Sequence, residues 1–150
     1  MKDAREAALR LLKFRPRSET ELKRRLRGKG FGEEAIQPIL EELRRKGLLD
    51  DAKFAQLFAT QQVLSKPVGH RLILSRLRAK GVDPHLAEQV VEAATQGQDE
   101  LELARQVASK RIASLKDLPR EAARRRLFGF LSRRGFSTDL VMRVVRETLQ

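Results

Sequence analysis

Few side chains in this sequence have the types and spacing that chemistry requires. His70 and His85 are the two histidines, and they lie fifteen residues apart with no cysteine and no cluster of carboxylates beside them. A metal site or a catalytic base needs partners at short, defined spacings, which neither histidine has. The fragment GKG at residues 28–30 lacks the spacing of a phosphate-binding loop. We therefore expect no catalytic residue, no metal and no cofactor, and interpret both histidines as surface or cap-adjacent residues.

Paired carboxylates are a second candidate for acid–base chemistry. They stand at residues 33–34, 41–42 and 50–51. The first and last pairs fall at expected helix starts, where acidic side chains favour the positive end of the helix dipole. We interpret them as structural, and the sequence predicts a protein that is not an enzyme.

Lysine and arginine carry the strongest signal. The 150-residue chain has 32 of them against 20 Asp and Glu, giving a formal net charge of +12 and a pI of about 11.0. The net charge is +5 over residues 1–50, zero over 51–100 and +7 over 101–150. An excess of this size predicts a polyanionic or acidic partner, contacted more by the two ends of the chain than by its middle.

The composition is typical of helices. Hydrophobic residues make up 41% and charged residues 35%, and no alternating stretch is long enough to argue for a strand. No apolar run approaches the ~18 residues that span a bilayer, and the first residues lack the order of a signal peptide. With no cysteine available for disulfides, a reducing compartment is expected. The prediction is an all-α, cytoplasmic protein with no membrane partner.

One motif occurs three times. LRGKGF, LRAKGV and LSRRGF align on Gly30, Gly81 and Gly135, at spacings of 51 and 54 residues. A glycine just past a helix cap turns left-handed without steric cost, and the apolar residue after it folds back on the last turn. The residues expected to cap the helices that follow are Gly32, Asp83 and Ser137. Each site therefore predicts a tight corner between two helices.

Other helix boundaries complete a repeated pattern. Ser18 with Glu21 predicts a capping box, and Gly47 predicts a further glycine cap. We count nine helices, three per unit, with units at residues 1–48, 49–97 and 98–150. The predicted fold is three tandem three-helix repeats in an elongated, curved array. A single compact bundle of nine helices stays open as the alternative.

The second helix of each unit carries arginines away from its apolar stripe, when residues are placed at about 100° intervals. These candidate binding residues are Arg24, Arg27, Arg71, Arg78, Arg125, Arg126 and Arg133. Units stacked in register would align them into a stripe that tracks a phosphate backbone or an acidic protein. A single arginine of this kind is more often a solvated surface residue, so the stripe as a whole carries the hypothesis. With seven Phe and no Trp or Tyr, base stacking is not expected.

Five sequence blocks occur in a fixed order along nearly the whole chain. They are RPRSETEL (15–22), LRGKGF (26–31), GLLDDAKFA (47–55), LRAKGV (77–82) and LSRRGF (131–136). In this order and spacing they resemble the RecX family of recombination regulators. The resemblance implies three tandem three-helix units in a bacterial protein of DNA recombination, repair and the SOS response that binds the RecA filament on DNA. It also implies inhibition of RecA ATP hydrolysis, strand exchange and coprotease activity, by a protein that contacts single-stranded DNA within the filament and DNA alone more weakly. We expect a monomer.

The sequence departs from the family pattern in one place. Family members usually carry basic residues and an aromatic before the second helix of the middle unit, where Gln61, Gln62 and Val68 stand here, while Gly69 matches. We therefore expect a smaller electrostatic share from the middle unit. Two rival functions stay open: a basic helical protein that binds duplex DNA without RecA through helix-turn-helix-like corners, and an adaptor for another acidic protein.

Overall fold

The protein is entirely helical over residues 3–150, the part that a computed structural model describes. The first repeat contains α1 (Ala4–Phe14), α2 (Glu19–Gly28) and α3 (Glu33–Arg45). The second contains α4 (Asp51–Ser65), α5 (His70–Ala79) and α6 (Pro84–Ala94). The third contains α7 (Glu100–Ser109), α8 (Ile112–Leu115), α9 (Arg120–Arg133) and α10 (Thr138–Thr148). No helix in this range has the length and apolar content to cross a bilayer.

The predicted count of nine helices was one short, because the described residues form ten. The additional element, α8, is a single turn of four residues between α7 and α9. A segment this short has too few apolar positions to show helical periodicity, so the sequence pattern passes over it. The third unit therefore has three long helices and one extra turn.

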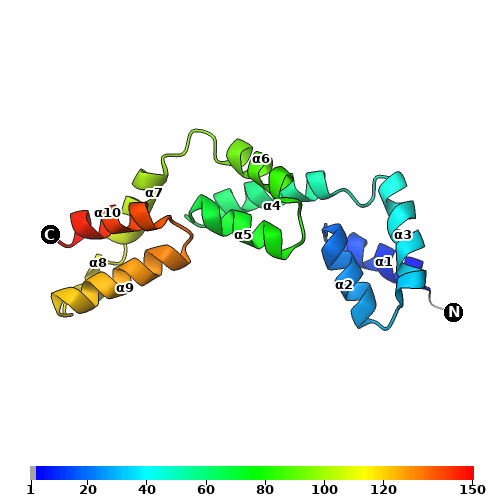
Figure 1. Ribbon diagram of the computed structural model, residues 1–150, viewed down its shortest axis with the longest axis horizontal. Helices are drawn as coiled ribbons and strands as arrows, with labels where there is room; N and C mark the ends of the chain where they lie inside the picture. Colours follow the sequence, from blue (N-terminus) through cyan, green and yellow to red (C-terminus); the bar gives the residue numbers. More distant parts are fainter. Residues whose placement is uncertain (1–2) are drawn as a thin grey trace.

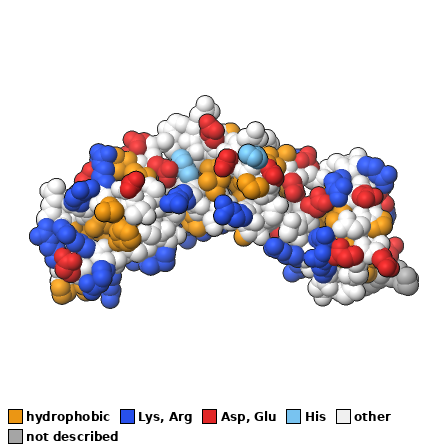
Figure 2. Space-filling model, viewed as in Figure 1, with side chains coloured by type: hydrophobic (Ala, Val, Ile, Leu, Met, Phe, Trp, Pro, Cys, Tyr) orange, Lys and Arg blue, Asp and Glu red, His pale blue; other side chains and the backbone are white. Residues whose placement is uncertain are grey.

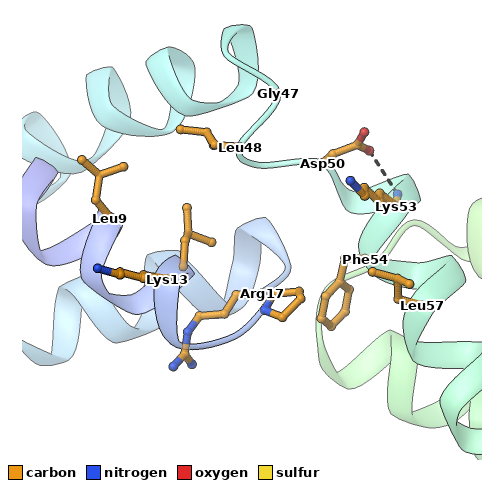
Figure 3. Close-up of a pocket in the computed structure, with 11 residues that line it drawn as sticks. Leu9, Lys13, Arg17, Gly47, Leu48, Asp50, Lys53, Phe54 and Leu57 are labelled. Atoms are coloured by element: carbon orange, nitrogen blue, oxygen red, sulfur yellow. Dashed lines mark hydrogen bonds between the residues drawn. The ribbon is translucent and has the colours of Figure 1, made fainter.

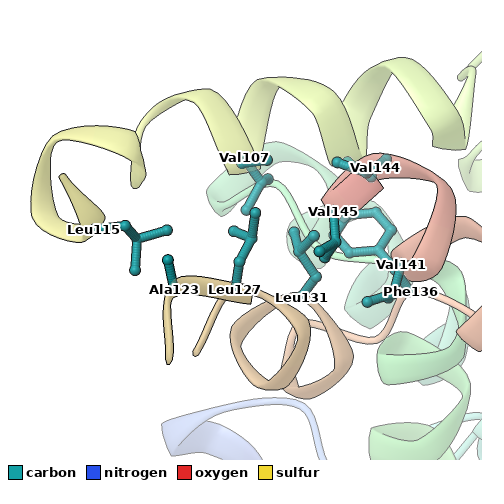
Figure 4. Close-up of a cluster of buried hydrophobic side chains, with 11 residues drawn as sticks. Val107, Leu115, Ala123, Leu127, Leu131, Phe136, Val141, Val144 and Val145 are labelled. Atoms are coloured by element: carbon teal, nitrogen blue, oxygen red, sulfur yellow. The ribbon is translucent and has the colours of Figure 1, made fainter. Parts of the chain in front are cut away.

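The three repeats follow one another along an arch, with the N-terminal repeat at one end and the C-terminal repeat at the other (Figure 1). Within the described residues 3–150, each repeat encloses its own cluster of buried side chains, and no cluster spans two repeats. In the third repeat, Val107, Leu127 and Val144 point toward one another from α7, α9 and α10 (Figure 4). The elongated array is thus confirmed, and the compact bundle is wrong.

The second long helix lies at the centre of each core. Two of its large apolar residues, one turn apart, are fully buried in each repeat, with exposed fractions of at most 1%. These pairs are Leu22 and Leu26, Ile73 and Leu77, and Leu127 and Leu131. Burial of each such side chain contributes about 2 kcal/mol. Because the buried stripe is narrow, the remaining face of each helix is left to solvent.

The three glycine corners have the predicted geometry. Gly30, Gly81 and Gly135 adopt positive φ angles of 97°, 76° and 92°. At the first corner the N–H of Phe31 donates to Leu26 O at 3.2 Å and that of Gly30 donates to Arg27 O at 2.9 Å. The same pair of bonds closes the other two corners, which is the Schellman arrangement. The capping box is also confirmed, since Ser18 and Glu21 each accept from the other's backbone N–H.

Two glycines allow the second and third repeats to touch. A Cβ added at Gly69 would lie 2.2 Å from the Gly135 carbonyl oxygen, and one added at Gly135 would lie 2.4 Å from Leu72 Cβ. Gly69 has an ordinary extended backbone, with φ −72° and ψ 156°, so its constraint is space and not conformation. Gly32 holds the same N-cap position on α3 with a similar backbone and has nothing within 4 Å of its Cβ position.

These two N-cap glycines make a matched test of the contact between repeats. We expect Gly69→Ala to lower the free energy of unfolding by about 2 kcal/mol, because backbone atoms must move apart. Gly32→Ala removes no contact and should cost about 0.5 kcal/mol or less. Urea denaturation followed by circular dichroism measures both. Equal effects of the two substitutions would contradict the close approach at Gly69.

Candidate functional site

The helices α2, α5 and α9 meet end to end along the inner side of the arch (Figure 1). At the first joint, the start of α2 meets the end of α5. Ser18 Oγ donates a hydrogen bond to Lys80 O at 2.6 Å, and Arg24 Nη1 donates to Ala79 O at 2.9 Å. The last carbonyls of α5, which lack partners within their own helix, are therefore satisfied by the neighbouring repeat.

The second joint repeats the first with different residues. The Gly69 N–H at the start of α5 donates to Arg134 O at the end of α9, at 2.7 Å, and Arg134 Nη1 donates to Pro67 O at 3.1 Å. Gly69 stands twelve residues before the corner glycine of its repeat, as Ser18 does, and Arg134 stands one before, as Lys80 does. At both joints the negative end of one helix dipole meets the positive end of the next.

A carboxylate from the next repeat completes each joint. The N–H of Glu19, the first residue of α2, donates to Asp51 Oδ1 at 2.8 Å, and that of His70, the first residue of α5, donates to Glu100 Oε2 at 3.3 Å. Asp51 and Glu100 are themselves the first residues of α4 and α7. Burial raises the pKa of Asp51, and the Glu19 N–H partly opposes that rise. The acidic pair at 50–51 is structural as predicted, and Asp51 binds across the joint.

Glu21 is the charged centre of the first joint. Its carboxylate accepts from Arg15 Nη2 at 3.0 Å, from Lys80 Nζ at 3.1 Å and from the Ser18 N–H at 3.2 Å. Burial alone would raise the pKa of Glu21, but the bonds from Arg15, Ser18 and Lys80 outweigh it and lower the pKa to about 2. The carboxylate is therefore charged throughout the neutral range and ties two repeats together.

All seven arginines predicted to form a stripe are exposed. They lie on α2, α5 and α9, the three helices that the joints connect. Arg24 bridges the first joint, and Arg27 Nε donates to Glu33 Oε1 at 2.6 Å. Within residues 3–150 the other five, Arg71, Arg78, Arg125, Arg126 and Arg133, make no hydrogen bond or ion pair inside the protein. Their guanidinium groups are available to a partner.

The middle repeat is neutral overall but strongly polarised. Its α5 carries Arg71, Arg76 and Arg78 and no acidic residue, whereas α6 carries Glu88 and Glu92 and no Lys or Arg. In Figure 2, Lys and Arg atoms gather along the lower, inner edge of the arch, and Asp and Glu atoms occur over its upper middle. We call α2, α5 and α9 together the basic row. Although residues 51–100 have zero net charge, α5 is as basic as this name requires, because the acidic residues lie on other elements.

The sequence analysis named some of the joint residues, Arg24 among them, but did not predict the joints themselves or the part of Lys80 and Arg134 in them. Lys80 and Arg134 precede their corner glycines, and a basic residue at that position in all three copies was the available signal. His70 follows the N-cap Gly69 directly, so its prediction as a cap-adjacent residue is confirmed. Its half-buried place at the second joint was not predicted; there Nδ1 lies 3.2 Å from Glu100 Oε1 and Nε2 lies 3.2 Å from Gln98 Oε1. His85 is exposed near the start of α6, as predicted.

Because the first two repeats meet through helix ends, a groove stays open between α1 and α4 (Figure 3). It has a volume of about 400 Å³, and four leucines are among the residues that line it, with Leu48 and Leu57 about half exposed. Arg17 borders it and caps α1, donating from Nε to Leu11 O at 3.3 Å. In the described part of the chain, no three His, Cys, Asp or Glu side chains gather where a metal ion could bind.

The fold and the basic row together define a tandem-repeat helical protein, an arched array of three-helix units. Family comparison identifies which array this is. Residues 4–43, 50–91 and 98–145 match the first, second and third three-helix domains of RecX, respectively. The chain belongs to the RecX family.

Individual relatives agree over nearly the full length. The regulatory protein RecX of Amycolatopsis mediterranei (strain U-32) is 36% identical over 99% of this chain and 85% of its own. That of Pelodictyon phaeoclathratiforme is 37% identical over 93% of this chain and 84% of its own. The crystal structure of RecX from Lactobacillus salivarius, 22% identical, covers 97% of this chain and 94% of its own with a TM-score of 0.76. A second crystal structure of a regulatory protein RecX, 23% identical, covers 94% of this chain and 70% of its own with a TM-score of 0.82, so the fold is shared.

The depressed pKa of Glu21 predicts a pH dependence of stability. In the unfolded chain the carboxyl has its ordinary pKa of 4.5, and in the folded protein about 2, so its contribution is complete above pH 4.5 and is lost as the pH falls toward 2. We expect Glu21→Gln to lower the free energy of unfolding at pH 6, and the difference from wild type to shrink between pH 4.5 and 2. Denaturation curves at several pH values measure it.

Glu34→Gln is the control, because Glu34 is exposed and makes no ion pair within residues 3–150. Its effect should be small at every pH. A difference between wild type and Glu21→Gln that stayed constant from pH 6 to pH 2 would show that the charge of Glu21 does not hold the joint.

Proposed function

We propose that this protein is a cytoplasmic, non-enzymatic regulator that binds the RecA recombinase filament on DNA and inhibits its ATP hydrolysis, strand exchange and coprotease activities. The observation that carries the proposal is the basic row. Three helices joined end to end along the inner side of an arch carry the seven predicted arginines, and the five on α5 and α9 have no partner inside the described protein. Membership of the RecX family and the regulatory names of its relatives point to the same function.

The row suits a filament better than a compact partner. Its charges are spread along the length of the arch, so one partner must supply acidic groups over that whole distance. A filament of identical subunits on DNA presents the same groups at regular intervals, and in this proposal the row pairs with acidic protein groups, DNA phosphate or both. Inhibition then comes from occupying space or locking neighbouring subunits together, and it needs no catalytic residue, metal or cofactor.

In this proposal the protein acts as a monomer and binds DNA alone only weakly. The rival, a basic helical protein that binds DNA without RecA, draws on the same row of arginines. Binding measured against salt separates the two, because a protein that neutralises several phosphates loses affinity steeply as salt rises. Tight binding that requires RecA favours the regulator, and tight, salt-sensitive binding to DNA alone favours the rival.

The direct test is RecA ATP hydrolysis on excess single-stranded DNA, with this protein added at two salt concentrations. We expect inhibition at protein levels well below those needed to coat the DNA. No inhibition, or inhibition only once the DNA is saturated, would contradict a filament regulator and favour the DNA-binding rival. Separate assays of RecA strand exchange and coprotease activity, with this protein added in the same way, test the other two parts of the proposal.

A charge reversal tests the basic row itself. We expect Arg125→Glu combined with Arg126→Glu to raise the concentration for half-inhibition by about tenfold, or ~1.4 kcal/mol, because two exposed contacts become repulsive. Circular dichroism and the melting temperature should be unchanged, since both side chains are exposed.

The matched control is Arg10→Glu combined with Lys53→Glu, which reverses two exposed charges on α1 and α4, outside the row. If both double variants lost inhibition to the same extent, net charge and not the row would be responsible. Unfolding of the Arg125 and Arg126 variant would refute their placement on the surface.

A further inference from the structure

A second surface on the third repeat combines apolar and basic side chains. Phe128 of α9 and Met142 of α10 are large apolar residues with exposed fractions of 37% and 52%. Both line a hollow of about 250 Å³. A second hollow of about 450 Å³ adjoins it, and the two share Arg124, Phe128 and Val145. We call this surface the α9–α10 groove. Figure 2 displays a hydrophobic area surrounded by Lys and Arg atoms over this repeat.

Every charged residue that lines the groove is an arginine. Arg124 and Arg125 come from α9 and Arg146 from α10, and no acidic residue lines either hollow. None of the three makes an ion pair or hydrogen bond within residues 3–150. Arg124 is half-buried, and its Nε–H is buried without an acceptor. A guanidinium left unsatisfied in this way is stabilised when an incoming carboxylate accepts from it.

We propose that the α9–α10 groove docks an acidic segment of the recombinase filament that carries a large apolar side chain. The apolar side chain seats on Phe128 and Met142, and carboxylates beside it pair with Arg124, Arg125 and Arg146. This inference rests on the proposed function and adds a protein-specific contact to it. Charge complementarity favours a partner with acidic side chains. The apolar floor of the groove also requires that partner to supply an apolar side chain.

The composition of the groove favours protein over nucleic acid as the occupant. Its floor is Phe128, Met142 and Val145, and the flexible thioether of methionine adapts to varied apolar side chains. A phosphate backbone needs cations in sequence along a track. Arg124 and Arg125 belong to α9 of the basic row, but together with Arg146 they border an apolar centre. A peptide with one buried apolar side chain and flanking acids satisfies both parts of the groove.

The absence of cysteine from the chain makes thiol footprinting clean, since one introduced cysteine is the single reactive thiol. The test variant is Met142→Cys, and the control is Ile112→Cys on α8, in the same repeat and 44% exposed. Each is labelled with a maleimide alone, with single-stranded DNA, and with RecA filaments on that DNA, after co-sedimentation has measured binding. We expect the filament to slow labelling of Met142→Cys by about tenfold and to leave Ile112→Cys unchanged.

A second comparison tests the charge. Adding Arg146→Gln to the Met142→Cys variant should weaken its protection, whereas adding Arg10→Gln, an exposed residue on α1, should not. Co-sedimentation without protection of Met142→Cys would overturn the groove while leaving the proposed function in place. Absence of co-sedimentation would overturn the proposed function, and the docking with it.

The remaining outcomes identify other occupants and each overturns the proposal. Protection by single-stranded DNA alone would assign the groove to nucleic acid. Protection that rises with protein concentration and needs no partner would assign it to a second copy of the chain. Equal protection of the two cysteine variants would show that the whole repeat is shielded, with no preference for the groove.

Discussion

The hydrogen bonds between helix ends of neighbouring repeats determine the shape of this protein. At each joint the last carbonyls of one second helix accept from the start of the preceding one, through Ser18 and Lys80 at the first joint and Gly69 and Arg134 at the second. Because each repeat has its own core, the described part of the chain has no shared apolar cluster that would fix the angle between units. Helix ends already need partners for their unpaired groups and carry opposite partial charges, so end-to-end contact satisfies both requirements at once.

The basic row is a consequence of this arrangement. Helices that bury only two or three apolar residues each leave much of their surface exposed, and end-to-end contact joins three such surfaces into one. The acidic residues near these helices are largely engaged at the joints and ion pairs, as Glu19 with Arg44, Glu21 with Lys80 and Glu33 with Arg27. Charge that would otherwise cancel within each unit is thus separated, most clearly between α5 and α6. The row and the joints are two results of the same packing.

The sequence was sufficient for the parts of the fold that depend on neighbouring residues. The residues that form the Gly81 corner, or the Ser18 capping box, lie within six positions of one another, so the local sequence pattern alone predicts these features. The joints depend on residues far apart in the chain: Ser18 and Lys80 are 62 positions apart and Arg134 and Pro67 are 67. No local pattern predicts such pairs. The exposure of the predicted arginines followed from helical periodicity, whereas the half-buried position of His70 followed from a joint and was missed.

Electron cryo-microscopy of RecA filaments on single-stranded DNA, decorated with this protein, tests the central claim most directly. The account predicts that the arch lies along the filament with α2, α5 and α9 all facing it, and with α6 turned toward solvent. A map in which the protein touches the filament through one repeat alone, or in which the basic row faces solvent, would contradict it.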